Sequence, residues 1–568
     1  MTTVAEHVLD AMAMAHAVVA DPQFRFPARP RVVPGLVRID TPDGLLVEGG
    51  PTRQSFQGNA ATGLLRRVMD AADGTGDRTE LARRLEVPAA RLWPVLSLLY
   101  TTGLLEDAES VVATTDSAPD PRLAFLARSI DTTRVNISGT QAAQRWQQAR
   151  VQLVGDPAQD GFTRALAGAL RRDGAGAVTI TTDPSLAAPT GVGITLLIAV
   201  GDTPRVRAAA LTARAAGVPV LPVRLEADRL HVGPLLDSVH TACARCALAG
   251  RSAVTGHVDE IDSHRTDFAA ALVAREVFTM LSRVGTSPAE RYLVSTDLDT
   301  LEQANRAITP DPSCVVCMDP PDPTAPAGDG IPLAWAYTHA VAFRPRSAVN
   351  PRDHQVHYNS GNIALQRRHR AWPASPLVPL RQADRATALP PGLHRDTVGH
   401  LLIRIAGLRH GPSGGPNRVD RWCATGGNLG SVSVYLVARD VAGLEPGIYG
   451  FSRAEPALAR LTWADPHTPV AGVPDDAGAA LVLTGALDIV ATKYGPFAWR
   501  ILQLDAGVAL TQAHRVAAGL GLAVTPAVTW DDDRLAELLA TAGDAEPITA
   551  VAAVAPLSHP LQPISGAR

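Results

Sequence analysis

The spacing of apolar and polar residues in the first hundred positions predicts a small sheet followed by helices. Short apolar pieces separated by Gly and Pro are typical of strands and turns, and they lie at Val33–Ile39, Leu45–Glu48 and Gln54–Gln57. Helical spacing follows, with Leu92, Val95, Leu98 and Leu99 on one face of the last stretch. The order favours a winged helix-turn-helix over residues 28–106. The helices expected are Asn59–Ala72, Thr79–Leu85 with Thr79 as its cap, and Ala89–Thr102.

From Val151 the pattern changes to an alternation of short apolar strands and amphipathic helices. Such alternation predicts a parallel, doubly wound α/β sheet. A long helix over Thr266–Ser282 precedes the second of two cysteine pairs. The strands expected are Val151–Val154, Val178–Thr181, Gly193–Val200 and Val218–Leu225, with helices at Thr163–Arg171 and Val206–Ala216.

Shifts in composition set the expected domain boundaries. Residues 107–145 are rich in Ala, Thr, Ser and Asp, and Pro and Gly gather at 320–332 and 373–391. We therefore expect an N-terminal arm at 1–27, linkers at 107–145 and 346–370, an α/β domain at 146–345 and a last domain at 371–568.

Composition narrows the function classes. The chain of 568 residues has 46% hydrophobic and 19% charged residues, which is a globular composition. Its net charge of -4 gives no support for nucleic-acid binding, and it has no apolar run of about 18 residues that would span a membrane. The first residues lack a basic segment before an apolar core, so we expect no secretory signal and a cytoplasmic location.

Four of the five cysteines form two Cys-x-x-Cys pairs, Cys243 with Cys246 and Cys314 with Cys317. In a reducing compartment this spacing favours a metal over disulfides. Four thiolates in a tetrahedron are the usual ligands of structural zinc, which leaves no open position for chemistry. Two unrelated buried pairs, or a redox pair, are the alternatives.

The first α/β turn lacks the spaced glycines of a nucleotide-binding loop. Asp156 and Asp160 occupy it instead, and their charge opposes a pyrophosphate. We expect the shape of a nucleotide-binding domain without that function.

The segment VGPLL at 232–236, with the two cysteine pairs, resembles the E1-like (ThiF-like) partners of azole-forming cyclodehydratases in ribosomal peptide biosynthesis. The resemblance covers residues 28–345. It implies a winged helix that binds the leader of a precursor peptide as an added strand, an E1-like domain with structural zinc, and a YcaO-type cyclodehydratase as partner.

The sequence RWCATGGNLGS at 421–431, with VYLV at 434–437 and GLEPGIY at 443–449, is similar to SagB-type azoline dehydrogenases. These enzymes have a nitroreductase-like α+β fold, bind FMN and pair as homodimers. The resemblance implies FMN contacts from Arg421, Thr425, Gly426, Gly427 and Asn428. Thr425 stands where a Ser is common in the family.

Arg381 and Arg385 lie about where that family holds the FMN phosphate, although Ala383 replaces a common Ser. Two solvated surface arginines are an equal alternative, and the cluster Arg367, Arg368 and Arg370 competes for the role.

Lys493 and Tyr494 match the Lys-Tyr pair that the family uses near its flavin, with Gln512 further along. A buried Lys can act as the base that takes a ring proton. An ordinary surface Lys beside a core Tyr is the alternative.

These patterns together predict FMN-dependent oxidation of azolines to thiazoles or oxazoles in a precursor peptide. Two other functions stay open: a non-catalytic leader-binding scaffold, and a small-molecule nitroreductase.

Overall fold

The computed structural model describes residues 26–50, 52–108, 120–181, 195–248, 262–317, 332–350, 360–381, 388–409 and 419–557. The chain divides into two compact units, one spanning Asp10–Val356 and a second that includes His357–Arg568. Among the described residues, no helix combines the length and apolar character needed to cross a membrane.

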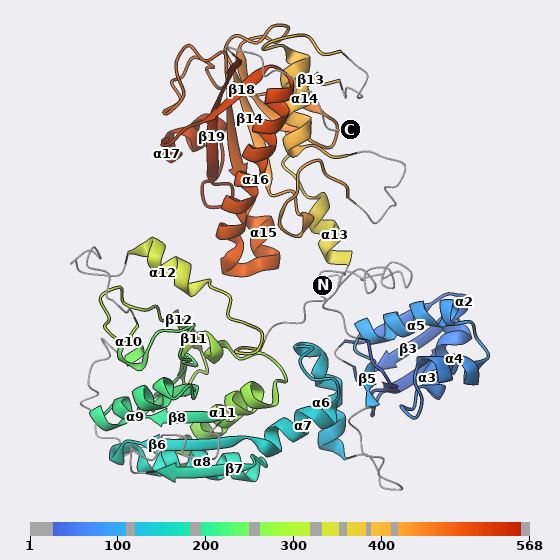
Figure 1. The fold of residues 1–568 in the computed structure, drawn as a ribbon, viewed down its shortest axis with the longest axis vertical. Helices are drawn as coiled ribbons and strands as arrows, with labels where there is room; N and C mark the ends of the chain where they lie inside the picture. The colour runs from blue at the N-terminus through green and yellow to red at the C-terminus, as the bar shows by residue number, and fades with distance from the viewer. Residues whose placement is uncertain are drawn as a thin grey trace, which may run out of the picture. The chain divides into compact units, whose positions relative to one another are not determined.

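The first unit begins with a three-stranded antiparallel sheet in the order β2-β3-β4, followed by helices (Figure 1). Its apolar core joins Leu45 and Val47 of the sheet to Leu81, Leu96 and other helix residues. A separate two-stranded ribbon pairs β1 with β5. The elements are β1 (Pro30–Val32), β2 (Val37–Thr41), β3 (Gly44–Glu48), β4 (Gln54–Gln57), α2 (Asn59–Thr62), α3 (Leu64–Ala71), α4 (Arg78–Leu85), α5 (Ala89–Thr101) and β5 (Leu105–Asp107).

Two local expectations for this region were wrong. The strand expected at Val33–Ile39 is interrupted, because Pro34 and Gly35 separate β1 from β2. The cap of α4 is Asp77, whose carboxylate accepts a hydrogen bond of 2.9 Å from the Glu80 amide. Thr79 lies inside the first turn, since the helix begins one residue before it.

The segment expected as a linker at 107–145 instead contains two helices, α6 (Pro121–Ser129) and α7 (Gly139–Gln148). Asp120 and Ser138 cap them, each accepting a hydrogen bond from a first-turn amide. Leu126 and Ala142 are buried between them with other apolar residues. The composition of this segment resembles a linker, but its few apolar residues have helical spacing and form a core.

The second sheet of this unit has seven strands in the order β12-β11-β10-β9-β8-β6-β7. Only β7, β6, β8 and β9 are parallel, and β10, β11 and β12 add antiparallel strands. The expectation of a parallel sheet therefore holds for these four strands. The three antiparallel strands were not predicted from the sequence. The strands are β6 (Arg150–Gly155), β7 (Ala177–Thr181), β8 (Leu196–Val200), β9 (Val220–Leu225), β10 (Arg229–Val232), β11 (Tyr292–Asp297) and β12 (Gln303–Ala307).

Helices cover both faces of the parallel strands. The core on one face joins α8 (Asp160–Arg172) and α11 (Ser263–Ser282) to the sheet. The core on the other face contains α9 (Pro204–Ala215) and α10 (Ala244–Leu248). The parallel half is thus doubly wound, and α12 (Leu333–Ala340) follows the cysteine pairs.

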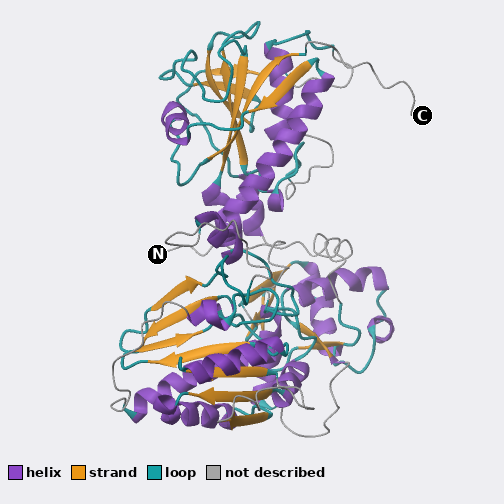
Figure 2. Ribbon diagram, turned by 60° about the vertical axis from the view of Figure 1, so that its left-hand side comes forward, coloured by secondary structure: helices purple, strands orange, loops and turns teal. Residues whose placement is uncertain are grey.

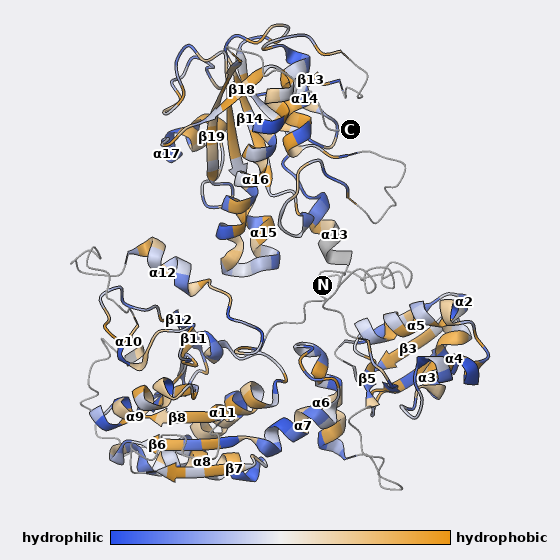
Figure 3. Cartoon of the chain, in the orientation of Figure 1, coloured by the Kyte–Doolittle hydropathy of each residue, from blue (hydrophilic) through white to orange (hydrophobic). Residues whose placement is uncertain are grey.

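The second unit is a seven-stranded antiparallel sheet in the order β13-β16-β15-β14-β17-β19-β18, flanked by helices on both faces (Figure 2). All seven positions of β14 and of β17 are buried. The hydropathy colouring shows the same apolar strands (Figure 3). The elements are α13 (Ser360–Arg367), β13 (Leu377–Pro379), α14 (Arg395–Ala406), β14 (Val432–Ala438), β15 (Gly447–Ser452), β16 (Ala457–Arg460), β17 (Ala479–Gly485), α15 (Leu487–Tyr494), α16 (Ala498–Gly519), β18 (Leu522–Pro526), α17 (Asp532–Leu539) and β19 (Ile548–Pro556).

The two faces of this sheet have separate cores. Even-numbered residues of β14, such as Val434 and Leu436, pack with α14 and α16. Odd-numbered ones, such as Tyr435 and Val437, pack with α17. Side chains alternate in this way because successive residues of a strand point to opposite faces of the sheet.

Candidate functional site

The loop at residues 425–431, which we call the glycine loop, leads into β14 and is held in a tight turn. The Gly430 amide donates to Thr425 Oγ1 at 2.8 Å. Gly427 has φ of 59° and Asn428 has φ of 57°, so two successive residues are left-handed. A glycine adopts this conformation without the steric cost of a side chain, which explains the glycine at 427.

A buried carboxylate on α16 accepts hydrogen bonds from the glycine loop. Asp505 is only 5% exposed, and its Oδ1 accepts from the Gly426 amide at 2.9 Å. Its Oδ2 accepts a hydrogen bond from the Ser431 hydroxyl. Burial raises the pKa of Asp505, while the two hydrogen bonds oppose that shift. The sequence analysis gave Asp505 no role, since a single acidic residue in an apolar helix has no motif.

The structure brings Lys493 and Tyr494, at the end of α15, against the same loop. A Cβ built on Gly427 would lie 2.7 Å from Lys493 Nζ and 2.6 Å from Tyr494 Oη. The Lys493 nitrogen is 5.3 Å from the centroid of the Tyr494 ring. Burial lowers the pKa of Lys493, and burial together with the charge of Asp505 raises the pKa of Tyr494.

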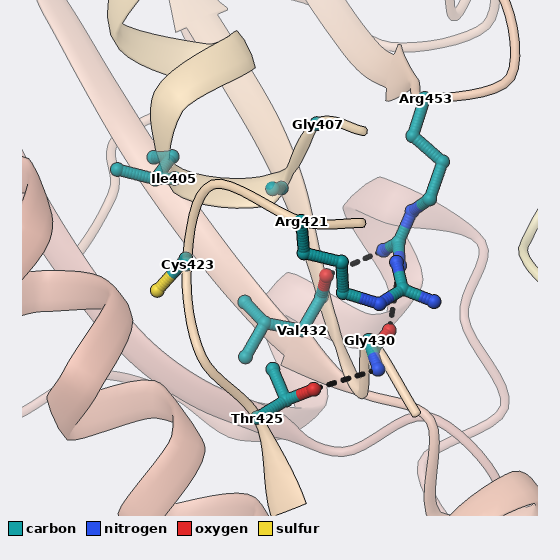
Figure 4. A pocket seen from close by; sticks show the side chains of 9 residues that line it. Ile405, Gly407, Arg421, Cys423, Thr425, Gly430, Val432 and Arg453 are labelled. Atoms are coloured by element: carbon teal, nitrogen blue, oxygen red, sulfur yellow. Dashed lines mark hydrogen bonds between the residues drawn. The ribbon is translucent and has the colours of Figure 1, made fainter. Parts of the chain in front are cut away.

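Two arginines meet at the other end of the glycine loop (Figure 4). Arg421 donates through Nε to the Asn428 carbonyl at 3.2 Å, and also bonds the carbonyls of Gln366 and Leu429. Arg453 donates to the Gly430 carbonyl at 2.6 Å and to the Val432 carbonyl at 2.5 Å. We call the pocket they line the arginine pocket; its lining is Ile405, Ala406, Gly407, Arg421, Cys423, Thr425, Gly430, Val432 and Arg453.

Burial in this pocket makes both guanidinium groups weaker bases. It lowers the pKa of Arg421 to about 10. Burial, and then repulsion by Arg421, lowers the pKa of Arg453 to about 9. Both groups still carry a positive charge near neutral pH. Arg453 lies in the turn after β15, just beyond the GLEPGIY segment, and no motif in the sequence includes it.

The other residues predicted to bind the cofactor lie at several separate places in the second unit. Asn428 donates its amide to the Val419 carbonyl at 2.7 Å. Gln512 lies two helical turns beyond Asp505, about 10 Å along α16. Arg381 is exposed just after β13, and Arg385 lies outside the described residues.

The competing arginine cluster has protein partners. Arg368 pairs with Asp488 at 2.9 Å, and Arg370 pairs with Glu546. Both side chains are therefore engaged in holding α13 and the chain after it to this unit.

In the first unit, the structure gathers the four cysteines Cys243, Cys246, Cys314 and Cys317, with all sulfur atoms within 4.8 Å of one another. The Cys243–Cys314 and Cys246–Cys317 sulfur distances are both 3.7 Å, and all four thiols are free. Sulfurs bound to one tetrahedral zinc at about 2.3 Å would be about 3.8 Å apart. The cluster could therefore hold a metal ion.

The first α/β turn satisfies its own amides. Asp156 Oδ1 accepts from the Ala158 amide at 3.1 Å, at the position where a nucleotide phosphate would approach. A Cβ on Gly201 would lie 2.6 Å from Asp156 Cβ, so this side chain also packs against the neighbouring strand end. The geometry agrees with a turn that has no phosphate site.

No protein-family model matches the chain, and no curated protein sequence matches it. The heterocyclase TruD matches 52% of this chain and 43% of its own, at 18% identity and a TM-score of 0.38, so this chain spans less than half of TruD. Escherichia coli MccB matches 51% of this chain and 96% of its own, at 12% identity and a TM-score of 0.37. A nitroreductase described as putative, from Anabaena variabilis, matches 35% of this chain and 45% of its own, at 22% identity and a TM-score of 0.27.

Proposed function

We propose that the second unit is an FMN-dependent dehydrogenase that oxidises azolines to azoles in a ribosomally made precursor peptide. The observation that carries this proposal is the convergence of Lys493, Tyr494 and the glycine loop at Gly427. The half-buried amine of Lys493 lies beside the backbone of Gly427, which has no side chain. This arrangement suits the binding of a flat ring and a proton transfer.

The residues present fit a bound flavin. Gly427 has no side chain, and a Cβ at this position would lie against Lys493 Nζ. One ligand could therefore contact both the Gly427 backbone and the Lys493 amine. Arg421 Nη1 is buried and has no hydrogen-bond partner, which a ligand can supply. Arg421, Thr425, Gly426, Gly427, Asn428 and Gln512 would hold the cofactor, and Arg381 and Arg385 are candidates from the sequence for its phosphate. FMN, when bound, supplies the hydride acceptor for the oxidation.

The chain's own residues then perform the proton transfer. Lys493 has a pKa lowered by burial, so more of it is the free amine near neutral pH. That amine takes the proton from one ring carbon of the azoline. Tyr494 has a raised pKa and stays protonated, so its hydroxyl can donate a hydrogen bond to a heteroatom of the azoline ring.

The first unit would bind the precursor peptide. β2 is an edge strand of its three-stranded sheet, and its residues Val37 and Ile39 are 56% and 45% exposed. An extended leader peptide can add to such an edge through main-chain hydrogen bonds, with apolar contacts to these two residues. The four cysteines would hold structural zinc, and a YcaO-type cyclodehydratase would be the partner that makes the azolines.

The experiment incubates the full chain and FMN with an azoline-containing precursor, with and without its leader, and follows peptide mass. We expect each ring to lose two hydrogens, and the loss to be faster with the leader attached. Flavin-loaded protein that leaves the azolines unchanged would refute the dehydrogenase.

One observation favours a second function, a leader-binding scaffold without catalysis. The Thr425 hydroxyl and the Asn428 amide both bond to protein backbone, so these two predicted cofactor ligands are occupied in part. Purified protein that stays colourless and does not retain added FMN would support the scaffold.

A further inference from the structure

The arginine pocket holds a buried guanidinium, that of Arg453, and a partly buried one, that of Arg421, and no carboxylate is among its described lining residues. Burial lowers the pKa of Arg421, and no described acidic residue opposes that shift. For Arg453, repulsion by Arg421 outweighs the attraction of Glu546. Buried like charges are costly, and they persist when protein dipoles or a ligand offset them.

The two guanidinium groups face the same point of the backbone. A Cβ on Gly430 would lie 2.3 Å from Arg421 Cζ and 2.6 Å from Arg453 Nη1, so these two atoms are less than about 5 Å apart. Figure 4 shows the groups side by side at the pocket. Backbone carbonyls accept five hydrogen bonds from the two groups, but Arg421 Nη1 has no partner among the described residues.

A third donor lies on the same wall. Thr425 Oγ1 is used as an acceptor by the Gly430 amide, so its hydroxyl proton remains free to be donated. The other side chains around the pocket are apolar or a thiol, including Ile405, Val432 and Cys423. The described lining includes no carboxylate, so a ligand could supply the missing acceptor for Arg421 Nη1.

We propose that the arginine pocket binds a phosphate group, and that this phosphate belongs to the flavin nucleotide. A phosphate monoester carries nearly two negative charges near neutral pH, which matches two guanidinium groups. The assignment to the flavin rests on the proposed function, whereas the phosphate site itself does not. It places the phosphate at Arg421 and Arg453 rather than at Arg381 and Arg385.

The test compares FMN with riboflavin, which lacks the phosphate, by fluorescence titration of the full chain. We expect FMN to bind more tightly, and Arg421→Gln, which also removes hydrogen bonds to the glycine loop, to weaken FMN by about 10- to 100-fold more than it weakens riboflavin. Arg534→Gln is the matched control, because Arg534 is exposed on α17 and pairs with Glu537 at the surface. It should bind both flavins as the unaltered chain does.

A second measurement needs no substitution, since Arg453 variants would also lose the bonds that hold the glycine loop. Inorganic phosphate added to the unaltered chain should compete with FMN and leave riboflavin binding unchanged. Free phosphate that competes with both ligands equally, or with neither, contradicts the assignment to the flavin.

The failures of the two proposals are distinguishable. If the preference for FMN survives in Arg421→Gln and disappears in Arg381→Gln, the pocket is overturned and the dehydrogenase stands. If Arg421→Gln weakens both flavins equally, Arg421 only supports the loop, and the phosphate site is overturned. If neither flavin binds, the dehydrogenase fails, and binding of inorganic phosphate that Arg421→Gln abolishes still supports the pocket.

Discussion

Replacing Gly427 by Ala tests whether the contact between the glycine loop and the Lys-Tyr pair matters. The residue has φ of 59°, a left-handed conformation that costs an L-residue about 1–2 kcal/mol. The added Cβ would lie 2.7 Å from Lys493 Nζ and 2.6 Å from Tyr494 Oη. These are the ends of side chains, so we expect them to move aside while the backbone stays in place.

Gly521→Ala is the matched control. Gly521 has φ of 71°, and an added Cβ would meet nothing within 4 Å. Both variants should therefore lose about 1–2 kcal/mol of unfolding free energy, measured by denaturant titration. Only Gly427→Ala displaces the proposed base, and a displacement of about 1 Å can cost about 100-fold in rate.

The assay measures azoline oxidation by FMN-loaded protein for both variants. We expect Gly427→Ala to fall by at least about 10-fold and Gly521→Ala to keep the rate of the unaltered chain. If the two variants oxidise at the same rate, the position of Lys493 and Tyr494 against Gly427 does not matter for the reaction.

Substitutions at three other residues, Lys493, Asp505 and Cys314, give separate tests. The oxidation rate should rise with pH as Lys493 loses its proton, at a pH below that of an ordinary lysine because burial lowers its pKa; Lys493→Ala should remove this rise from the pH profile. Asp505→Ala leaves the Gly426 amide and the Ser431 hydroxyl unpaired and should cost about 2–4 kcal/mol by denaturant titration. The pKa of Asp505 is raised in the folded protein, so its protonation stabilises the fold at low pH, and this contribution is lost as pH rises through the folded pKa. The unfolding free energy of Asp505→Asn should therefore rise relative to that of the unaltered chain over this pH range. Cys314→Ser should lower the content of bound zinc, measured by metal analysis, and the melting temperature of the first unit, whereas Cys423→Ser should not change the zinc content.

The periodic elements were predictable from sequence where one face is buried. The helices at Asn59–Ala72 and Ala89–Thr102 and the strands of the α/β domain follow the apolar spacing, and the structure has elements at all these places. The last strands of that sheet were not detected. β12 is short and exposed at all five positions, so its sequence carries no alternation of apolar and polar residues.

The site was predictable only in part, for a similar reason. Lys493 and Tyr494 were found through a motif, and the structure places them at the glycine loop. Asp505 bonds Ser431 across 74 residues of the chain, and Arg453 bonds Gly430 across 23. No local pattern in the sequence predicts either contact. Contacts of this kind depend on the sheet and helix that bring distant segments together.

The most direct test of the central claim is a single turnover without oxygen. FMN-loaded full chain is mixed with an azoline-containing peptide, and the visible absorbance of the oxidised flavin is followed together with the peptide mass. We expect the flavin absorbance to bleach in step with the formation of one azole per bound flavin. Flavin that stays oxidised while the azoline remains intact would contradict the account.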